Sequence, residues 1–399
     1  MQLGMRGYCM RIGLNLVRFV PGEMGGMETY FRNLLHYLQQ LDRTNKYWLL
    51  CDERYAGEFE LFNPSFTIKP WNYTQPSWRW FVRGVLRNTL KVDILRPAFN
   101  RLEVDLIHHP FSMLNPVGTR IPSVLTFHDM QHEFFPEFFS PFDLGQRREF
   151  YRRSAEEATR IIAISEHAKS CLVERYEINS KKIDVIYFGC NPNYRILEDQ
   201  DHLEEIRSKY GLHRPFMYYP AATWPHKNHT TLLAALKIMK DRYRFDGQLV
   251  LTGVAKQSHG TILDEIGRMG LDGMVNILGY LPADDLPWVF NLARLLIFPS
   301  LFEGFGMPLI EAMACGCPVA CSNVTSIPEV VGDAGLLFDP NSAEEMAEKS
   351  WMLWSDETLR SDLKLRGLDR RKQFSWETAA RKTIAVYEKA VGLPMQETL

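Results

Sequence analysis

The chain has 399 residues, which at about 150 residues per domain predicts two or three domains. Apolar residues make up 46% and charged residues 24%, a globular composition that excludes wholesale disorder. The formal net charge of −2 argues against a dedicated nucleic-acid binder, and no apolar run is long enough to predict a membrane span. Residues 1–13 contain no apolar stretch typical of a signal peptide, and the seven scattered cysteines fit a reducing cytoplasm.

Two stretches of alternating strand and helix patterns predict two parallel sheets with helices on both faces. The first stretch begins with an apolar strand at residues 10–17, a glycine-bearing loop at 21–26 and a helical pattern at 27–41. Ser165 is the predicted N-cap of a helix that runs to Tyr176. Further strands of this half are predicted at residues 104–108, 123–127, 160–164 and 183–187.

The pattern starts again after a charged, poorly periodic segment at residues 197–213. Strands of the second half are predicted at residues 216–219, 248–252, 275–278, 295–299 and 319–321. The terminal segment 376–391 has helical periodicity, with Ser375 as its predicted N-cap.

These patterns predict an α/β protein of two Rossmann-like, doubly wound domains, residues 1–208 and 209–375, that face a central cleft. We expect a helix in residues 376–399 to pack back on the N-terminal domain. Open α/β sheets bind ligands at the carboxyl ends of their strands, so the cleft is the expected site.

Residues 298–322, FPSLFEGFGMPLIEAMACGCPVACS, are the most informative segment. A strand ends, a loop with two glycines follows, and Pro308 fits the start of a helix. This layout directs free backbone N–H groups and a helix N-terminus toward the cleft, which is typical of an anion site. Glu303 precedes the helix and Glu311 is expected in its first turn, so both could reach one ligand with several hydroxyls. The alternative is that Glu311 only complements the helix dipole and Glu303 is a solvated loop residue.

This segment resembles the E-x₇-E signature of the family-4 retaining glycosyltransferases of the GT-B fold, also called glycosyl transferase group 1. Similar blocks follow the family's order over most of the chain: residues 326–340 (SIPEVVGDAGLLFDP), 222–235 (ATWPHKNHTTLLAA), 127–130 (FHDM), 163–169 (AISEHAK), and Gly25-Gly26 with Glu28. Together these blocks are specific, although each alone would be a weak signal.

The resemblance implies a role for each matching residue of the second half. Glu311 would hold the ribose hydroxyls of a nucleotide, and Glu303 would lie beside the transferred sugar. The N–H groups of three consecutive residues would contact sugar hydroxyls or phosphate: Gly304, Phe305 and Gly306.

Lys227 would neutralise the donor diphosphate, whose departure is easier when its growing charge is matched. The alternative is an exposed lysine at a helix start, an electrostatically unfavourable place for an idle cation. Many family members carry an arginine five or six residues before this lysine, where this chain has Ala221 and Ala222. His226 or Lys256 is the expected substitute.

His128 directly follows the predicted strand 123–127, and by resemblance it would contact the donor sugar near the reacting carbon. The alternative is a hydrogen-bonded structural histidine. Gly25 and Gly26 would let the backbone approach phosphate or acceptor closely, unless they form an ordinary turn. Glu28 could equally complement the dipole of its helix.

We expect neither a metal nor a cofactor. Cys315 and Cys317, followed by Cys321, lack the paired C-x₂-C spacing of structural zinc, so buried thiols are the favoured interpretation. No Asp-x-Asp follows a predicted strand, so the lysine and the helix N-termini would balance the diphosphate instead.

A basic, aromatic stretch covers residues 78–101, with Arg79, Arg83 and Arg87 four residues apart on one helical face. This pattern fits a helix that lies on an anionic membrane surface. The alternative is a core-packed amphipathic helix with a solvated basic face. We expect a cytoplasmic protein, and the membrane interpretation of this stretch, if it holds, adds a peripheral contact at the inner face of the cytoplasmic membrane.

The resemblance implies a retaining glycosyltransferase that moves a hexose from a nucleotide diphosphate sugar to a hydroxyl of a glycan or lipid-linked acceptor. The PHKNH form of the lysine block favours mannose and GDP-mannose, and the family favours surface polysaccharide or lipopolysaccharide biosynthesis. The alternatives are another GT-B enzyme, such as a nucleotide-sugar 2-epimerase or hydrolase, and a non-catalytic sugar-nucleotide binding module.

Overall fold

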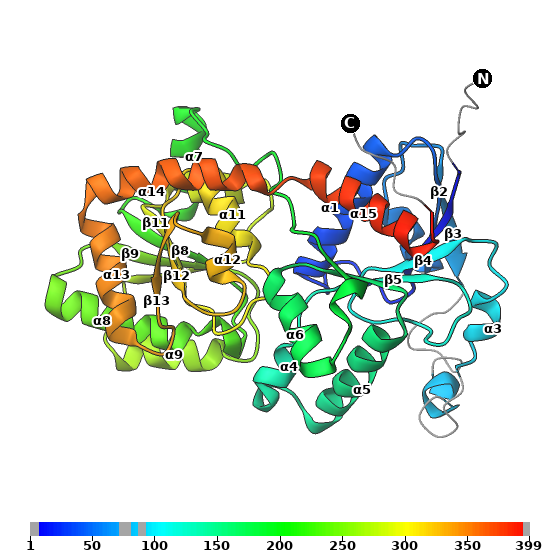
Figure 1. The fold of residues 1–399 in the computed structure, drawn as a ribbon. Helices are drawn as coiled ribbons and strands as arrows, with labels where there is room; N and C mark the ends of the chain where they lie inside the picture. The colour runs from blue at the N-terminus through cyan, green and yellow to red at the C-terminus, as the bar shows by residue number, and fades with distance from the viewer. Residues whose placement is uncertain (1–7, 72–80, 87–92, 394–399) are drawn as a thin grey trace. The chain divides into compact units, whose positions relative to one another are not determined.

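The computed structural model describes residues 8–71, 81–86 and 93–393, which divide into two compact units (Figure 1). The N-terminal unit comprises residues 1–189 together with 376–399, and the C-terminal unit comprises residues 190–375. The sequence predicted the boundary at residue 208. The segment before that residue packs within the C-terminal unit instead: the Leu197 N–H donates to Asn291 Oδ1 (3.0 Å), and Asn291 Nδ2 donates to the Arg195 carbonyl (2.9 Å).

The N-terminal unit has a parallel sheet of seven strands in the order β3-β2-β1-β4-β5-β6-β7. The strands are β1 (Arg11–Leu16), β2 (Lys46–Asp52), β3 (Phe66–Trp71), β4 (Leu106–His109), β5 (Ser123–Phe127), β6 (Arg160–Ala163) and β7 (Ile183–Val185). The α-helices are α1 (Gly26–Leu41), α3 (Arg96–Phe99), α4 (Gln131–Phe134), α5 (Pro141–Glu157), α6 (Glu166–Tyr176) and α15 (Trp376–Ala390), and residues 81–86 are also helical. The central strands β4 and β5 are buried on both faces, as expected for a parallel sheet covered by helices, although β4 ends in two buried histidines, His108 and His109.

The C-terminal unit has a parallel sheet of six strands in the order β10-β9-β8-β11-β12-β13. The strands are β8 (Phe216–Pro220), β9 (Gln248–Thr252), β10 (Val275–Gly279), β11 (Leu295–Phe298), β12 (Val319–Ser322) and β13 (Gly335–Phe338). The α-helices are α7 (Gln200–Tyr210), α8 (His229–Tyr243), α9 (His259–Arg268), α10 (Leu286–Leu292), α11 (Met307–Ala314), α12 (Ile327–Val331), α13 (Ala343–Ser355) and α14 (Glu357–Arg370). Both sheets have the strand order of doubly wound α/β domains.

The terminal helix α15 belongs to the N-terminal unit, where it lies beside α1 (Figure 1). A buried polar chain fixes it to the sheet: Tyr387 bonds His108 Nδ1 (2.7 Å), and His108 Nε2 bonds Thr126 Oγ1 (2.8 Å). Because both ring nitrogens have partners, this histidine is satisfied in the core. No helix in the described part of the chain is long and apolar enough to cross a membrane.

Candidate active site

The C-terminal sheet changes its direction of winding between β8 and β11, which are neighbours in the sheet. In doubly wound domains such a switch point leaves a crevice at the carboxyl ends of the two strands, where ligands bind. The segments that follow these two strands carry Lys227 and Glu303. The topology therefore brings together two of the residues that the sequence singled out.

Lys227 and Glu303 form an ion pair with 2.6 Å between Nζ and Oε1. The two side chains are only 18% and 13% exposed, so the pair is partly desolvated. The ammonium also lies 5.8 Å from the centre of the Phe298 ring. The expected exposure in the alternative interpretations, a solvated lysine and a solvated glutamate, is therefore wrong for this pair.

The turn that carries the lysine is fixed to the end of β11. Residues Pro225–Lys227 form one turn of 3-10 helix, and Asn228 then adopts a left-handed conformation with φ of 59°. The side-chain amide of Asn228 donates to the carbonyls of Pro299 (3.1 Å) and Pro340 (2.8 Å). A backbone bond from the Leu301 N–H to the His226 carbonyl (2.8 Å) adds a third tie. The lysine is thus pre-positioned by its backbone.

Hydrogen bonds to Thr325 and Ser326, which follow β12, hold the loop that carries Glu303. The Glu303 N–H donates to Thr325 Oγ1 (3.2 Å), and the Ser326 hydroxyl contacts the carbonyls of Glu303 (3.0 Å) and Phe305 (3.1 Å). Gly306 has φ of 97°, a conformation that favours glycine, and α11 begins at the next residue. The loop therefore has a fixed shape that leads directly into a helix N-terminus.

Glu311 lies in the second turn of α11, so its expected place in the first turn is wrong. The helix-dipole alternative loses its basis, because that effect is confined to the terminal turn. The carboxyl group is hydrogen bonded to the side chain of Tyr194, and burial raises its pKa to about 7. Such a carboxyl is half ionised near neutral pH and can accept hydrogen bonds from a diol when ionised.

His226 is a neutral imidazole near pH 7 when no donor is bound. Burial and the neighbouring Lys227 lower its pKa to about 3, so the imidazole is neutral near pH 7. Lys256 is exposed, and its ammonium lies 5.5 Å from the Trp224 ring centre. Its backbone N–H donates to Thr223 Oγ1 (2.6 Å), which places its loop beside the segment that lacks the arginine.

His229 is a residue that the sequence analysis missed. It is the first residue of α8 and is 3% exposed, and its ring packs against Tyr219 with 5.0 Å between centres. Neither ring nitrogen has a hydrogen-bond partner in the described part of the chain. Its signal in the sequence is its place at the end of the PHKNH block, two residues after Lys227.

In the N-terminal unit, His128 follows β5 as expected and is 6% exposed. Its Nε2 lies 2.7 Å from the Pro110 carbonyl, so Nε2 carries the proton and Nδ1 is the acceptor. Burial lowers its pKa to about 4, which makes the ring neutral near pH 7. Tyr30 of α1 packs edge-on against it at 5.1 Å between ring centres. The start of α1 and the end of β5 therefore lie together.

Gly25 and Gly26 form the entry to α1. Gly25 has φ of 51° at the N-cap position, and a side-chain carbon at this position would meet no other atom within 4 Å, so space remains beside the backbone. Glu28 accepts hydrogen bonds from the Gly22 N–H (2.7 Å) and Arg32 Nε (2.9 Å). This carboxylate therefore fixes the shape of the glycine loop.

The basic-face prediction for residues 78–101 is wrong at Arg83, while Trp78, Arg79 and Arg87 lie outside the described residues. Arg83 is buried and pairs with Asp93 through contacts of 2.5 and 2.8 Å, and it also bonds Asn115. The guanidinium turns inward because a carboxylate and an amide satisfy it there.

All seven cysteines are free thiols, and Cys315, Cys317 and Cys321 are buried. Among residues 8–71, 81–86 and 93–393, no group of three or more histidine, cysteine or carboxylate side chains could hold a metal ion.

Comparison with known proteins identifies the class. A model described as Glycosyltransferase Family 4 matches residues 24–194, and one described as Glycosyl transferases group 1 matches residues 203–370. The O-antigen chain mannosyltransferase B of Escherichia coli is 32% identical over 266 residues, which cover 67% of this chain and 70% of the relative. The serotype-specific mannosyltransferase WbdA of Escherichia coli is 31% identical over 246 residues, and this match spans 30% of that longer protein.

Solved structures agree on the fold. Anabaena Alr3699/HepE in complex with UDP and glucose superposes with a TM-score of 0.73 at 20% identity, covering 95% of this chain and 100% of that chain. The two sheets and their strand order are those of the GT-B fold. The chain belongs to the group 1, family-4 glycosyltransferases, and it is an enzyme of that class.

Proposed function

We propose that this glycosyltransferase transfers mannose from GDP-mannose to a hydroxyl of a glycan or lipid-linked acceptor, with retention of the anomeric configuration. The names of the relatives, O-antigen chain mannosyltransferase B and a serotype-specific mannosyltransferase, support mannose and the assembly of a surface polysaccharide. We place this reaction in the cytoplasm, where nucleotide sugars serve as substrates and no metal or cofactor is required.

The ion pair of Lys227 with Glu303 carries the proposal. A partly buried ammonium at a switch point suits a diphosphate, and a carboxylate beside it suits sugar hydroxyls. In the absence of a donor, each side chain neutralises the other. When the donor binds, its phosphate oxygens replace Glu303 as the partner of the Lys227 ammonium, and Glu303 accepts hydrogen bonds from the sugar hydroxyls.

In the transfer step, the bond between the anomeric carbon and the diphosphate oxygen breaks, and the acceptor oxygen forms a bond to the same face of that carbon. The departing diphosphate takes the acceptor's proton. Lys227 and the N–H groups of Gly304, Phe305 and Gly306 stabilise the negative charge that develops on it. Fixed donors of this kind are typically the largest electrostatic contribution to catalysis.

Two further residues complete the assignment. Glu311, in its ionised form, accepts hydrogen bonds from the ribose hydroxyls of the nucleotide. His128, as a neutral imidazole with Nδ1 as acceptor, contacts the donor sugar.

A thermal-shift panel of GDP-, UDP-, dTDP- and ADP-sugars tests donor choice, because a ligand that binds only the folded state raises the melting temperature. GDP-mannose should give the largest shift. Incubation with labelled donor then tests the reaction. With an acceptor present, the label should appear in the glycosylated acceptor, and without an acceptor the donor should remain intact. Release of free sugar without acceptor would indicate a hydrolase or epimerase, and binding without turnover would indicate a binding module.

We also propose a peripheral membrane contact through the helical residues 81–86. Phe81 is 66% exposed and Val85 is 44% exposed, so an apolar face points outward although Arg83 points inward. Flotation with phosphatidylglycerol vesicles should recover the protein, and Phe81→Ser should reduce recovery more than Leu365→Ser, a change at an equally exposed apolar residue of α14. Equal recovery of both variants would contradict this contact.

A further inference from the structure

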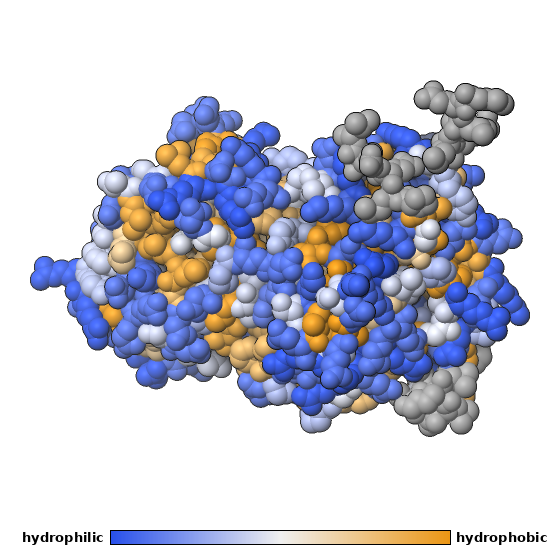
Figure 2. Space-filling model, viewed as in Figure 1, coloured by the Kyte–Doolittle hydropathy of each residue, from blue (hydrophilic) through white to orange (hydrophobic). Residues whose placement is uncertain are grey.

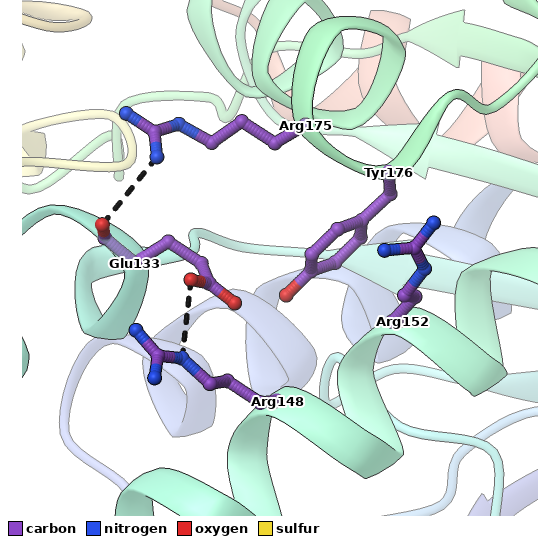
Figure 3. A pocket seen from close by; sticks show the side chains of 5 residues that line it. All are labelled: Glu133, Arg148, Arg152, Arg175 and Tyr176. Atoms are coloured by element: carbon purple, nitrogen blue, oxygen red, sulfur yellow. Dashed lines mark hydrogen bonds and ion pairs between the residues drawn. The ribbon is translucent and has the colours of Figure 1, made fainter.

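The N-terminal unit contains a pocket of about 480 Å³ that none of the assigned donor residues lines. Glu133 comes from α4, Arg148 and Arg152 from α5, and Arg175 and Tyr176 from the end of α6 (Figure 3). Figure 2 shows that the face around α5 is mostly hydrophilic, so the pocket lies in a polar surface.

The lining carries an excess of positive charge, since three arginines face one glutamate. Part of the charge of Arg152 is compensated outside the pocket, because its Nε lies 3.0 Å from Glu156 Oε1. Arg175 makes no ion pair with any residue in the described ranges. It contacts the Glu133 carbonyl at 3.4 Å and lies 3.9 Å over the ring of Phe134. Its charge is therefore available to a ligand.

The carboxylate of Glu133 in the pocket interacts with Arg148 and Tyr176. Glu133 Oε2 accepts a hydrogen bond from Arg148 Nε (3.3 Å), and the same carboxylate interacts with the hydroxyl of Tyr176. Tyr176 is buried and its hydroxyl also lies 3.2 Å from Nε2 of the buried His132. Glu133 thus orients Arg148 and the tyrosine, and the remaining guanidinium N–H groups are left for an anion.

Stability alone does not explain this arrangement. The side chains of Arg148 and Arg152 are 49% and 48% exposed, and ion pairs at such exposure contribute little to folding. Guanidinium groups bind phosphate through paired N–H donors, and here they come from two helices, α5 and α6, that line one pocket.

From this geometry we propose that the pocket between α4, α5 and α6 binds a phosphate or diphosphate group, with Arg148 and Arg175 as the principal donors and Arg152 as an additional charge. The group belongs either to a soluble phosphorylated ligand or to the headgroup of a lipid. The pocket lies in the unit that holds His128. This histidine precedes Glu133 by five residues, so the Cα atoms of the two residues lie at most about 18 Å apart.

Calorimetric titration with inorganic pyrophosphate tests the proposal on the full chain. The Lys227→Ala variant removes the phosphate site proposed for the donor, and the pocket should still bind pyrophosphate in it. Arg148→Gln/Arg175→Gln should weaken this remaining binding at least about tenfold, the usual order for losing charge-assisted contacts. The matched control is Arg153→Gln, because Arg153 is on the same helix but pairs with Glu157 (2.7 Å) outside the pocket.

Arg175→Gln alone serves as a second variant, because this side chain makes no ion pair with a described residue whose loss would unfold the protein. It should also weaken pyrophosphate binding, with an unchanged urea midpoint. Complete loss of binding in Lys227→Ala, or equal binding in the double arginine variant and the Arg153 control, would overturn the proposal. Either result leaves the proposed mannosyl transfer untouched, because transfer is measured separately.

Vesicles distinguish the two sources of phosphate. If the double arginine variant loses pyrophosphate binding and also floats less well with phosphatidylglycerol vesicles than the control, the result supports a lipid headgroup. Unchanged flotation together with lost pyrophosphate binding supports a soluble phosphorylated ligand.

Discussion

Glu311 should make the protein bind its donor more tightly as the pH rises. Its carboxyl group has a pKa raised to about 7 by burial, and only its ionised form is a pure acceptor for the ribose hydroxyls. About 9% of a group with this pKa is ionised at pH 6 and about 91% at pH 8. GDP-mannose should therefore bind about tenfold more tightly at pH 8 than at pH 6.

Calorimetry with GDP-mannose in the absence of acceptor measures this effect without the complication of free GDP, whose terminal phosphate titrates near pH 6. The nearby His226 and His229 have pKa values of about 3 and do not titrate in this range. Glu311→Gln should bind more weakly with little dependence on pH. The exposed Glu348→Gln of α13 is the control and should behave like the wild type. An unchanged pH dependence in Glu311→Gln would refute the assignment.

The same shift in pKa predicts a change in stability. A carboxyl whose pKa is higher in the folded than in the unfolded state destabilises the fold as pH rises from about 4.5 to about 7. The full effect is at most about 3 kcal/mol. The free energy of unfolding of Glu311→Gln should exceed that of the wild type at pH 8 and approach it at pH 5, and a constant difference would contradict the inferred shift.

Three other changes have defined outcomes. Glu303→Gln frees Lys227 from its partner, so GDP should bind as tightly or more tightly while transfer falls by about 10²-fold; weaker GDP binding in calorimetry would argue against a competing carboxylate. Asp93→Ala removes the carboxylate that balances the charge of the buried Arg83 and should lower the free energy of unfolding by about 3–5 kcal/mol in urea titration, where a change below about 1 kcal/mol would refute the burial of the pair. Gly306→Ala forces a side chain into a left-handed backbone conformation and should cost about 1–3 kcal/mol, a prediction that fails if the melting temperature is unchanged.

Much of the fold was predictable because its strands are short apolar runs with clear ends. The predicted strands at 123–127 and 248–252 match β5 and β9, since these central strands are buried on both faces and, apart from Gln248 at the start of β9, consist of apolar or small residues. The prediction omitted β2, β3 and β13. The outer strand β3 contains Pro70 and alternates poorly in burial, so its place is set by pairing with β2 rather than by its own pattern.

The candidate site was predictable where local motifs carry it. Lys227 and Glu303 were found from their motifs, and the sheet topology then brings them together. The inward turn of Arg83 depends on Asn115, which is distant in sequence, so helical periodicity assigned the side chain to the wrong environment. Burial raises the pKa of Glu311, while its hydrogen bond to Tyr194 lowers it. No sequence motif connects these two residues, so the shift could not be predicted.

Lys227→Ala tests the central claim most directly, with Lys237→Ala on the exposed face of α8 as the matched control. The Lys227 variant should retain its far-UV circular dichroism but lose about 10²–10³-fold in kcat/KM for mannosyl transfer, with GDP-mannose bound at least about tenfold more weakly. Donor affinity and kcat/KM equal to those of the Lys237 control would contradict the central claim.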